Sequence, residues 1–210
     1  MIKVDYLKVM NIDGAIFGMR MPMNSHSKSD SGFDPETGDY IIGDKDLDLM
    51  KRLYKAGPEH RKYLRQIVVA MDITSNQTFW LQFATYKVGT TGNSGSKMHT
   101  IHVREILPED FSHEGISEVG GETEECFLNV IDTLNDLRRK FNETHEKKYW
   151  RALIDLLPMG YNLRAFITMN YENVVNIIHQ RSGHKMFEWN EFCDILRSLP
   201  LVTDIMGDNG

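Results

Sequence analysis

Apolar residues recur at helical spacing through most of the second half of the chain. Phe127, Ile131 and Leu134 belong to a long stripe that ends near Phe141 and predicts a long helix. A second stripe begins at Tyr149 and stops at Pro158. The pattern further predicts, in chain order, a short strand over 162–168, a helix over 171–180 and a helix over 188–198 closed by Pro200. These elements together predict that the segment of about 121–200 is mainly helical.

The first half mixes shorter patterns. Its predicted elements are a strand pair over 2–18 with a turn at 11–14 and a second strand at 15–17, a helix capped by Asp44 and stopped at Gly57-Pro58, a buried strand over 64–73 and a helix over 74–84. Between them lies a long irregular segment, about 19–43, rich in Ser, Asp, Gly and Pro. The stretch 99–103 is too short to choose between strand and loop.

This order of elements does not alternate regularly between strand and helix. It therefore favours the α+β class over a doubly wound sheet, as one domain over 1–210 in which a small antiparallel or mixed sheet packs with long helices. The net charge of −6 argues against a general nucleic-acid binder. We expect no membrane partner, because no apolar run approaches the length of a span and the N-terminal stretch is not that of a signal peptide.

The two cysteines, Cys126 and Cys193, each lie in a helical pattern among apolar neighbours. Buried free thiols and a reducing, cytoplasmic compartment are the expected reading. The paired histidines His99 and His102 have no cysteine or carboxylate partner at a metal-binding spacing, so no metal site is predicted. No Gly-x-Ser-x-Gly elbow is present, and catalytic residues stay unknown.

The stretch TYKVGTTGNSGSKMHTI, residues 85–101, contains two lysines separated almost entirely by small residues. The order Gly95-Ser96-Lys97 excludes a P-loop, in which Gly and Lys precede Ser or Thr. Two readings stay open: a phosphate-binding backbone, or a flexible surface loop of the kind such residues usually form. The candidates for the first are Gly89, Gly92, Gly95, Ser94, Ser96, Lys87 and Lys97.

Polar residues also interrupt the apolar stripe of MNYENVVNIIHQRSGH. Asn170, Asn176 and Arg181 are six and five residues apart, which is not one helical face. The spacing suits a helix with polar groups at its start, its side and its end. Arg181 would favour the helix C-terminus in any protein, whereas buried asparagines need partners that a ligand's amide edge would provide.

Together these features resemble the flavin-dependent thymidylate synthases. Glu59-His60 match that family's Glu-His pair, and Gln82 falls where the family has a Gln. Where the family has Arg-His-Arg, this chain has Thr85-Tyr86-Lys87. The later matches are Leu157-Pro158, Asn170, Asn176, Arg181, His184 and Glu188, at spacings close to the family's.

The resemblance implies a role for each matched residue. The implied nucleotide-binding residues are Gln82, Lys87, Ser94, Ser96, Lys97 and Arg181. The implied cofactor-binding residues are His60, Tyr86, Asn170, Asn176 and His184.

It also implies a function: binding of FAD and of dUMP or an analogue, with NADPH as reductant and methylenetetrahydrofolate as one-carbon donor if the chain is catalytic. Members form homotetramers. The replaced Arg-His-Arg motif fits a divergent member that acts on a different nucleotide or base. The alternative is a non-catalytic oligomer that sequesters a nucleotide or signalling molecule on the same scaffold.

Overall fold

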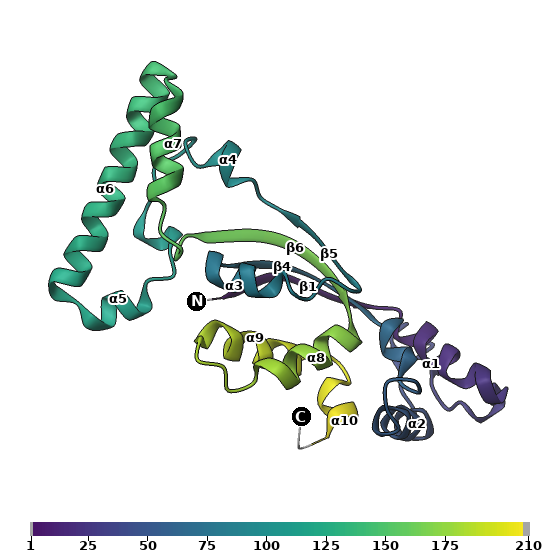
Figure 1. The fold of residues 1–210 in the computed structure, drawn as a ribbon. Coiled ribbons are helices and arrows are strands. Elements are labelled where there is room, and N and C mark those ends of the chain that lie inside the picture. Colours follow the sequence, from purple (N-terminus) through teal and green to yellow (C-terminus); the bar gives the residue numbers. More distant parts are fainter. Residues whose placement is uncertain (1, 208–210) are drawn as a thin grey trace. The chain divides into compact units, whose positions relative to one another are not determined.

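The chain is described by a computed structural model in which residues 2–207 are placed (Figure 1). Four strands form one sheet in the order β1-β4-β6-β5, with antiparallel neighbours, and two short strands form a separate hairpin. The strands are β1 (Lys3–Met10), β2 (Gly32–Phe33), β3 (Tyr40–Ile41), β4 (Val68–Asn76), β5 (Thr90–Ser94) and β6 (Asn162–Asn170). In the hairpin, Gly32 pairs with Ile41 and Phe33 with Tyr40.

Helices make up most of the rest. The α-helices are α1 (Ile12–Arg20), α2 (Asp44–Lys55), α3 (Gln77–Phe83), α4 (Lys97–Thr100), α5 (Glu114–Val119), α6 (Gly121–Thr144), α7 (Lys147–Leu156), α8 (Tyr171–Arg181), α9 (Phe187–Arg197) and α10 (Val202–Met206). Short 3-10 turns are η1 (Met21–Met23), η2 (His26–Lys28), η3 (Lys62–Arg65) and η4 (Pro108–Asp110). The predicted α+β class is confirmed.

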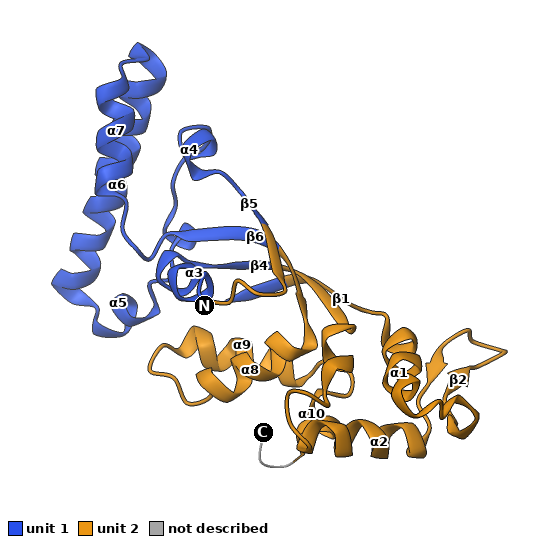
Figure 2. Cartoon of the chain, turned by 45° about the vertical axis from the view of Figure 1, so that its right-hand side comes forward, with its two compact units in different colours: residues 1–4, 73–85, 93–166 blue, residues 5–72, 86–92, 167–210 orange. Residues whose placement is uncertain are grey.

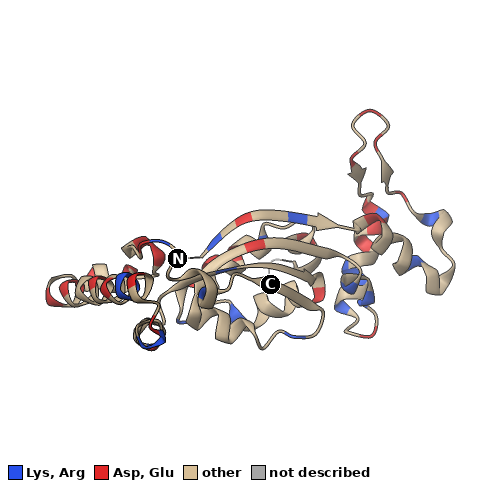
Figure 3. Cartoon of the chain, turned by 90° about the horizontal axis from the view of Figure 1, so that it is seen from above, with Lys and Arg blue, Asp and Glu red and all other residues tan. Residues whose placement is uncertain are grey.

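The chain divides into two compact units (Figure 2). Unit 1 comprises Met1–Val4, Ile73–Thr85 and Asn93–Phe166, and unit 2 comprises Asp5–Asp72, Tyr86–Gly92 and Ile167–Gly210. Each of the four long strands contributes residues to both units. Acidic and basic residues are spread along the chain, so the negative net charge does not come from one acidic tail (Figure 3).

Each unit has its own buried apolar residues. In unit 1, Phe127, Ile131 and Leu134 on α6 pack with Leu153 on α7 and with Ile106, and the buried Asn135 amide hydrogen-bonds both backbone groups of Ile106. In unit 2, α8 and α9 bury the largest side chains, which include Tyr171, Trp189 and Phe192. A helix anchored on such a buried face is held by packing rather than by its intrinsic propensity.

Several predicted boundaries are correct. The long helix predicted around Phe127–Phe141 is α6, and α2, α7, β6, α8 and α9 lie within a few residues of the predicted ranges. The segment 19–43 is irregular apart from η1, η2 and the β2–β3 hairpin. The stretch 99–103 begins as a helix, because His99 and Thr100 are the last two residues of α4.

The predicted strand at 15–17 is wrong, because these residues belong to α1. Asn11 adopts a left-handed conformation, with φ of 65°, and precedes the helix rather than a hairpin return strand. Ala15, Ile16 and Met19 then share the buried face of α1, which is a helical spacing. A strand pair and a short amphipathic helix are hard to separate over so few residues.

The strand predicted at 64–73 is displaced in the structure. Leu64 lies in η3, and β4 continues to Asn76, so Thr74–Asn76 are strand rather than helix. The helix α3 begins only at Gln77, where the Asn76 side-chain oxygen accepts a hydrogen bond from Phe79 N at 2.9 Å. A capping side chain therefore sets this boundary.

Three further expectations are corrected. Asp44 does not cap α2; the carboxylate of Asp30 accepts hydrogen bonds from the backbone N–H of Lys45 and Asp46 instead. The loop reading fails for Thr90–Ser94, which form the edge strand β5. Cys193 is buried, but Cys126 is exposed on α6, one residue away from the buried Phe127.

Candidate functional site

Arg181, the last residue of α8, is the most firmly held of the predicted nucleotide-binding side chains in unit 2. Its guanidinium carbon lies 4.6 Å from the centre of the Trp189 ring and 5.7 Å from that of Tyr86. Its Nε donates to the Tyr86 hydroxyl at 2.9 Å, and that hydroxyl donates to Gln180 Oε1 at 3.0 Å. Two aromatic contacts and a chain of hydrogen bonds therefore fix the orientation of a permanent cation.

His184 lies next to this arginine. Its Nδ1 accepts a hydrogen bond from the Met186 backbone N–H at 3.1 Å, so the proton of the neutral ring is on Nε2. Nε2 lies 3.4 Å from Arg181 Nη1. Two donors that face each other at this distance suit an acceptor atom shared between them, such as a carbonyl or phosphate oxygen.

Asn170 ends β6 and caps α8. Its Oδ1 accepts a hydrogen bond from Asn173 N at 3.1 Å. Its amide nitrogen lies close to Gly89, where an added Cβ would come within 2.4 Å of Nδ2, and Gly89 has a φ of +74°. Asn173 completes the contact by donating to Val88 O at 2.8 Å. The start of the small-residue stretch is therefore pinned to α8, and Gly89 is required there for both space and backbone conformation.

Asn176 lies in the middle of α8 and is half-buried. Its side-chain amide forms no hydrogen bond with any residue in the described range 2–207. A half-buried amide without protein partners suits a ligand that offers both donors and acceptors. The three polar residues of this segment thus occupy the start, the side and the end of one helix, as predicted.

The start of α8 is tied to η3. Glu172 forms ion pairs with Arg61, at 3.4 Å, and with Arg65, and the Tyr171 N–H donates to Ile67 O at 3.0 Å. His60 precedes η3 and is exposed in a turn, and Lys87 is exposed after Tyr86. Within residues 2–207, neither side chain forms a hydrogen bond with Arg181 or His184. Of the seven predicted residues in this unit, the structure brings together Tyr86, Arg181 and His184.

The other predicted nucleotide-binding residues lie in unit 1. Ser94 ends β5, and Ser96 precedes α4, where its carbonyl oxygen accepts from the His99 and Thr100 N–H groups. Both serines are exposed. Lys97 opens α4, is half-buried, and its Nζ donates to Gln77 Oε1. The backbone N–H of Gly95 donates to Arg164 O at 2.8 Å, so it is not available to a phosphate.

Gln82 lies in the last turn of α3, which is anchored to β6. The Trp80 indole N–H donates to Leu163 O at 2.9 Å, and the Gln77 amide donates to Pro158 O at 3.1 Å. Gln82 is half-buried, and its carbonyl oxygen accepts from the Thr85 hydroxyl at 2.8 Å. Gln77, the first residue of α3, also accepts the hydrogen bond from Lys97 and so links α3 to α4.

Four residues of these clusters were not predicted from the sequence. They are Gln77, Asn173, Gln180 and Trp189. Asn173 follows Asn170 by three residues, which is the spacing of a helix cap, and that signal was present. Trp189 gave no local signal, because its contact with Arg181 depends on the chain turn between α8 and α9.

Two other kinds of chemistry find no support in residues 2–207. No three His, Cys, Asp or Glu side chains in that range are grouped so that they could hold a metal ion. Burial raises the pKa of the Cys193 thiol, which disfavours the reactive thiolate.

No helix within residues 2–207 is long and apolar enough to cross a membrane.

A scan of protein-family models finds no match to the sequence, and a search of curated proteins finds none either. The structure, in contrast, is similar to solved structures of the flavin-dependent thymidylate synthase ThyX from Helicobacter pylori with FAD and dUMP. Two of them match with a TM-score of 0.69 and 16% sequence identity. They cover 99% of this chain and 98% and 97% of their own. The chain therefore has the fold that the sequence resemblance predicts, over nearly its whole length.

Proposed function

We propose that the chain binds FAD and a pyrimidine deoxynucleotide, dUMP or an analogue. The observation that carries this proposal is Arg181, whose guanidinium is fixed by Tyr86 and Trp189 and faces the Nε2–H of His184. A fixed cation beside a second donor binds an anionic or carbonyl oxygen with little loss of conformational entropy on binding. The fold likeness supplies the kind of ligand to expect.

The donors and acceptors in unit 2 fit a flavin. The polar edge of the flavin ring carries carbonyl oxygens and an N–H group. Asn176 offers an unengaged amide with both donor and acceptor atoms, and His184 offers an N–H. A bound flavin would supply redox chemistry, so a nucleophilic cysteine is not required of the chain. In this proposal Asn176 and His184 hold the cofactor, and Arg181 holds the nucleotide.

The other residue roles that the resemblance implies are also part of this proposal. Gln82, Ser94, Ser96 and Lys97 would contact the nucleotide, Lys87 a phosphate group, and His60 and Asn170 the flavin. A catalytic chain would also need NADPH and methylenetetrahydrofolate as co-reactants. We further propose that the chain forms a homotetramer and lies in the cytoplasm, as the resemblance implies. Size-exclusion chromatography with light scattering would test the oligomeric state.

One observation favours the second candidate, a nucleotide-sequestering protein without catalysis. Tyr86 stands in the position of the family's imidazole, and its hydroxyl both donates to Gln180 and accepts from Arg181. A phenol engaged in this way orients Arg181, and its proton is directed at Gln180. The same structure therefore supports binding more strongly than turnover.

A flavin titration tests the proposal. Absorbance at the flavin bands is recorded for the purified chain, and FAD is then titrated while its fluorescence is followed. We expect bound flavin or quenching that saturates, and weaker binding in an Asn176→Ala variant. A colourless protein that quenches no added FAD would contradict flavin binding. If such a protein still bound dUMP, the sequestering function would replace the flavoprotein function.

A further inference from the structure

A cavity of about 360 Å³ lies in unit 2, and half of the side chains that line it are basic. Its walls come from the end of α1, from η1 and η2 with Ser25 between them, and from α2. The lining residues are Arg20, Met23, Ser25, Lys28, Lys45, Asp48, Leu49 and Arg52. Four cations face one carboxylate in a chain whose overall charge is −6, so the positive charge here is a local feature.

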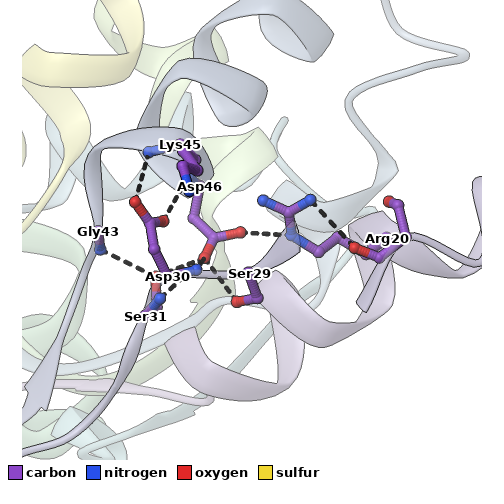
Figure 4. Close-up of polar contacts among 8 residues, drawn as sticks. Arg20, Ser29, Asp30, Ser31, Gly43, Lys45 and Asp46 are labelled. Carbon is purple, nitrogen blue, oxygen red and sulfur yellow. Dashed lines mark hydrogen bonds and ion pairs between the residues drawn. The ribbon is translucent and has the colours of Figure 1, made fainter. Parts of the chain in front are cut away.

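Arg20 is the lining residue of this cavity whose side chain is buried and held in place by hydrogen bonds. Its side chain is only 5% exposed, and its Nε donates to the fully buried Asp46 at 2.6 Å. Nη1 donates to Ser25 O at 3.3 Å. Within residues 2–207, Nη2 forms no hydrogen bond and is not a buried atom, so it is open to the cavities that Arg20 lines. Figure 4 shows the guanidinium held at one edge with this nitrogen unengaged.

Asp46 holds Arg20 in place. Its Oδ2 accepts from the hydroxyls of Ser29, at 2.6 Å, and Ser31, at 2.7 Å, and from the N–H groups of Asp30 and Ser31, both at 3.1 Å (Figure 4). This carboxylate fixes Nε of the guanidinium and Ser25 O accepts from Nη1, so Nη2 is the nitrogen left for an external anion. A cation oriented before binding loses little entropy when it binds.

The other cations are not neutralised equally. Arg52 is paired with Asp48 at 2.9 Å, as Arg20 is with Asp46. Lys28 and Lys45 form no ion pair with any residue of the described range 2–207. Two of the four cations that line the cavity therefore have no ion-pair partner in this range. Arg20 also lines a neighbouring cavity of about 440 Å³, but that cavity includes Asp13 and no lysine.

We propose that the cavity formed by Arg20, Lys28, Lys45 and Arg52 binds the phosphate or pyrophosphate group of a small phosphorylated ligand. The excess of two positive charges matches a dianion, and the planar arginine with two lysines matches phosphate oxygens. Met23 and Leu49 provide apolar walls for the remainder of the ligand. This site is separate from the proposed nucleotide site at Arg181 and does not depend on it.

The test is a calorimetric titration of inorganic pyrophosphate at low ionic strength into the Arg181→Ala chain, in which the nucleotide site is disabled. In this background, the Lys28→Ala/Lys45→Ala pair is compared with Lys51→Ala/Lys55→Ala, which removes the same charge from α2 outside the cavity. We expect at least tenfold weaker binding for the first pair and less than twofold for the second. Pyrophosphate should also slow hydrogen exchange in 23–28 and 45–52.

Three results would overturn the inference: no pyrophosphate binding, equal weakening by both lysine pairs, or slowed exchange only elsewhere in the chain. Thermal unfolding of each variant shows whether it is folded, and within residues 2–207 the side chains of both lysine pairs form no hydrogen bond or ion pair. Absence of dUMP binding to the parent chain, with pyrophosphate binding retained in Arg181→Ala, would instead contradict the proposed function alone.

Discussion

The two units hold their candidate ligand residues in different ways. In unit 2, Arg181 is fixed by Tyr86, which lies 95 residues away, and by the buried Trp189, and Arg20 is fixed by Asp46, 26 residues away. In unit 1, the Ser96 carbonyl oxygen accepts from the Thr100 hydroxyl four residues on, and among residues 2–207 the Lys97 side chain hydrogen-bonds Gln77 alone. Preorganised cations contribute more to affinity, whereas an exposed loop is easier to alter without loss of the fold.

The largest expected effect comes from Asp46→Asn. This change leaves the Arg20 charge buried without its partner, which costs roughly 3–5 kcal/mol of the free energy of unfolding. Urea denaturation at neutral pH measures it. The matched control is Asp48→Asn on the exposed Asp48–Arg52 pair of the same helix, for which we expect about 0–1 kcal/mol. Equal effects would show that burial does not distinguish the two pairs.

Asp46 also predicts a pH dependence. Burial by itself raises its pKa, but hydrogen bonds from Ser29, Ser31 and Arg20 outweigh burial and lower the pKa from 3.8 to about 2. The stabilisation is therefore present above about pH 4 and is lost as the pH falls toward 2, which is about 2 kcal/mol in total. The unfolding free energy of the parent should fall across this window, and that of Asp46→Asn should fall less. Parallel pH curves would contradict the assignment.

An effect of similar size on stability is expected for Trp189→Ala. Trp189 is fully buried, so truncation removes its packing and the surface on which Arg181 lies, at a cost of about 3–5 kcal/mol. Phe187→Ala on the same helix, at a side chain that is 43% exposed, should cost less than about 1 kcal/mol. Both values come from chemical denaturation. If Phe187→Ala were as damaging, α9 would not present the face described.

A smaller effect is expected for Tyr86→Phe, which keeps the ring and removes the hydroxyl between Arg181 and Gln180. The lost hydrogen bonds should lower stability by about 1 kcal/mol. Because Arg181 loses its Nε acceptor, nucleotide affinity should fall several-fold while flavin binding changes little. A parallel Tyr149→Phe change on α7 in unit 1 serves as the control. Unchanged nucleotide affinity in Tyr86→Phe would show that the hydroxyl does not orient Arg181.

The smallest effect is expected in unit 1. Lys97→Ala should change the free energy of unfolding by less than about 0.5 kcal/mol, because Lys97 has one side-chain partner at a half-buried position. Nucleotide affinity should fall a few-fold in the proposed function. Fluorescence titration measures it, with Lys87→Ala in the exposed loop as a comparison. A loss larger than that of Arg181→Ala would reverse the ranking of the two units.

Local patterns in the sequence were enough to predict the helical half and α2. The stripe through Phe127 and Leu134, the stop at Pro158 and the three polar positions of α8 depend on periodicity and on helix-terminating residues. The fold as a whole came from the ordered matches to a family, because sheet order depends on pairing between distant segments. The edge strand β5 was missed since its residues, TTGNS, have a turn-like composition.

The candidate site was predicted less completely for the same reason. Arg181, His184 and Tyr86 were identified one by one, but their mutual contacts and the part of Trp189 arise only when α8 and α9 pack. Likewise, no local signal in the irregular segment 19–43 showed that Asp30 caps α2, or that Asp46 and Arg20 meet. Long-range polar contacts of this kind follow from tertiary structure, not from residue spacing.

The central claim is that Arg181, fixed by Tyr86 and Trp189, binds the nucleotide. Titration calorimetry of dUMP with the parent chain, Arg181→Ala and Arg181→Lys, in the presence of FAD, tests it most directly. Loss of a charge-assisted contact corresponds to about 1.5–3 kcal/mol, or roughly tenfold to a hundredfold in Kd. We expect that loss in Arg181→Ala, with partial recovery in Arg181→Lys. Equal affinity of all three folded proteins for dUMP would contradict the claim.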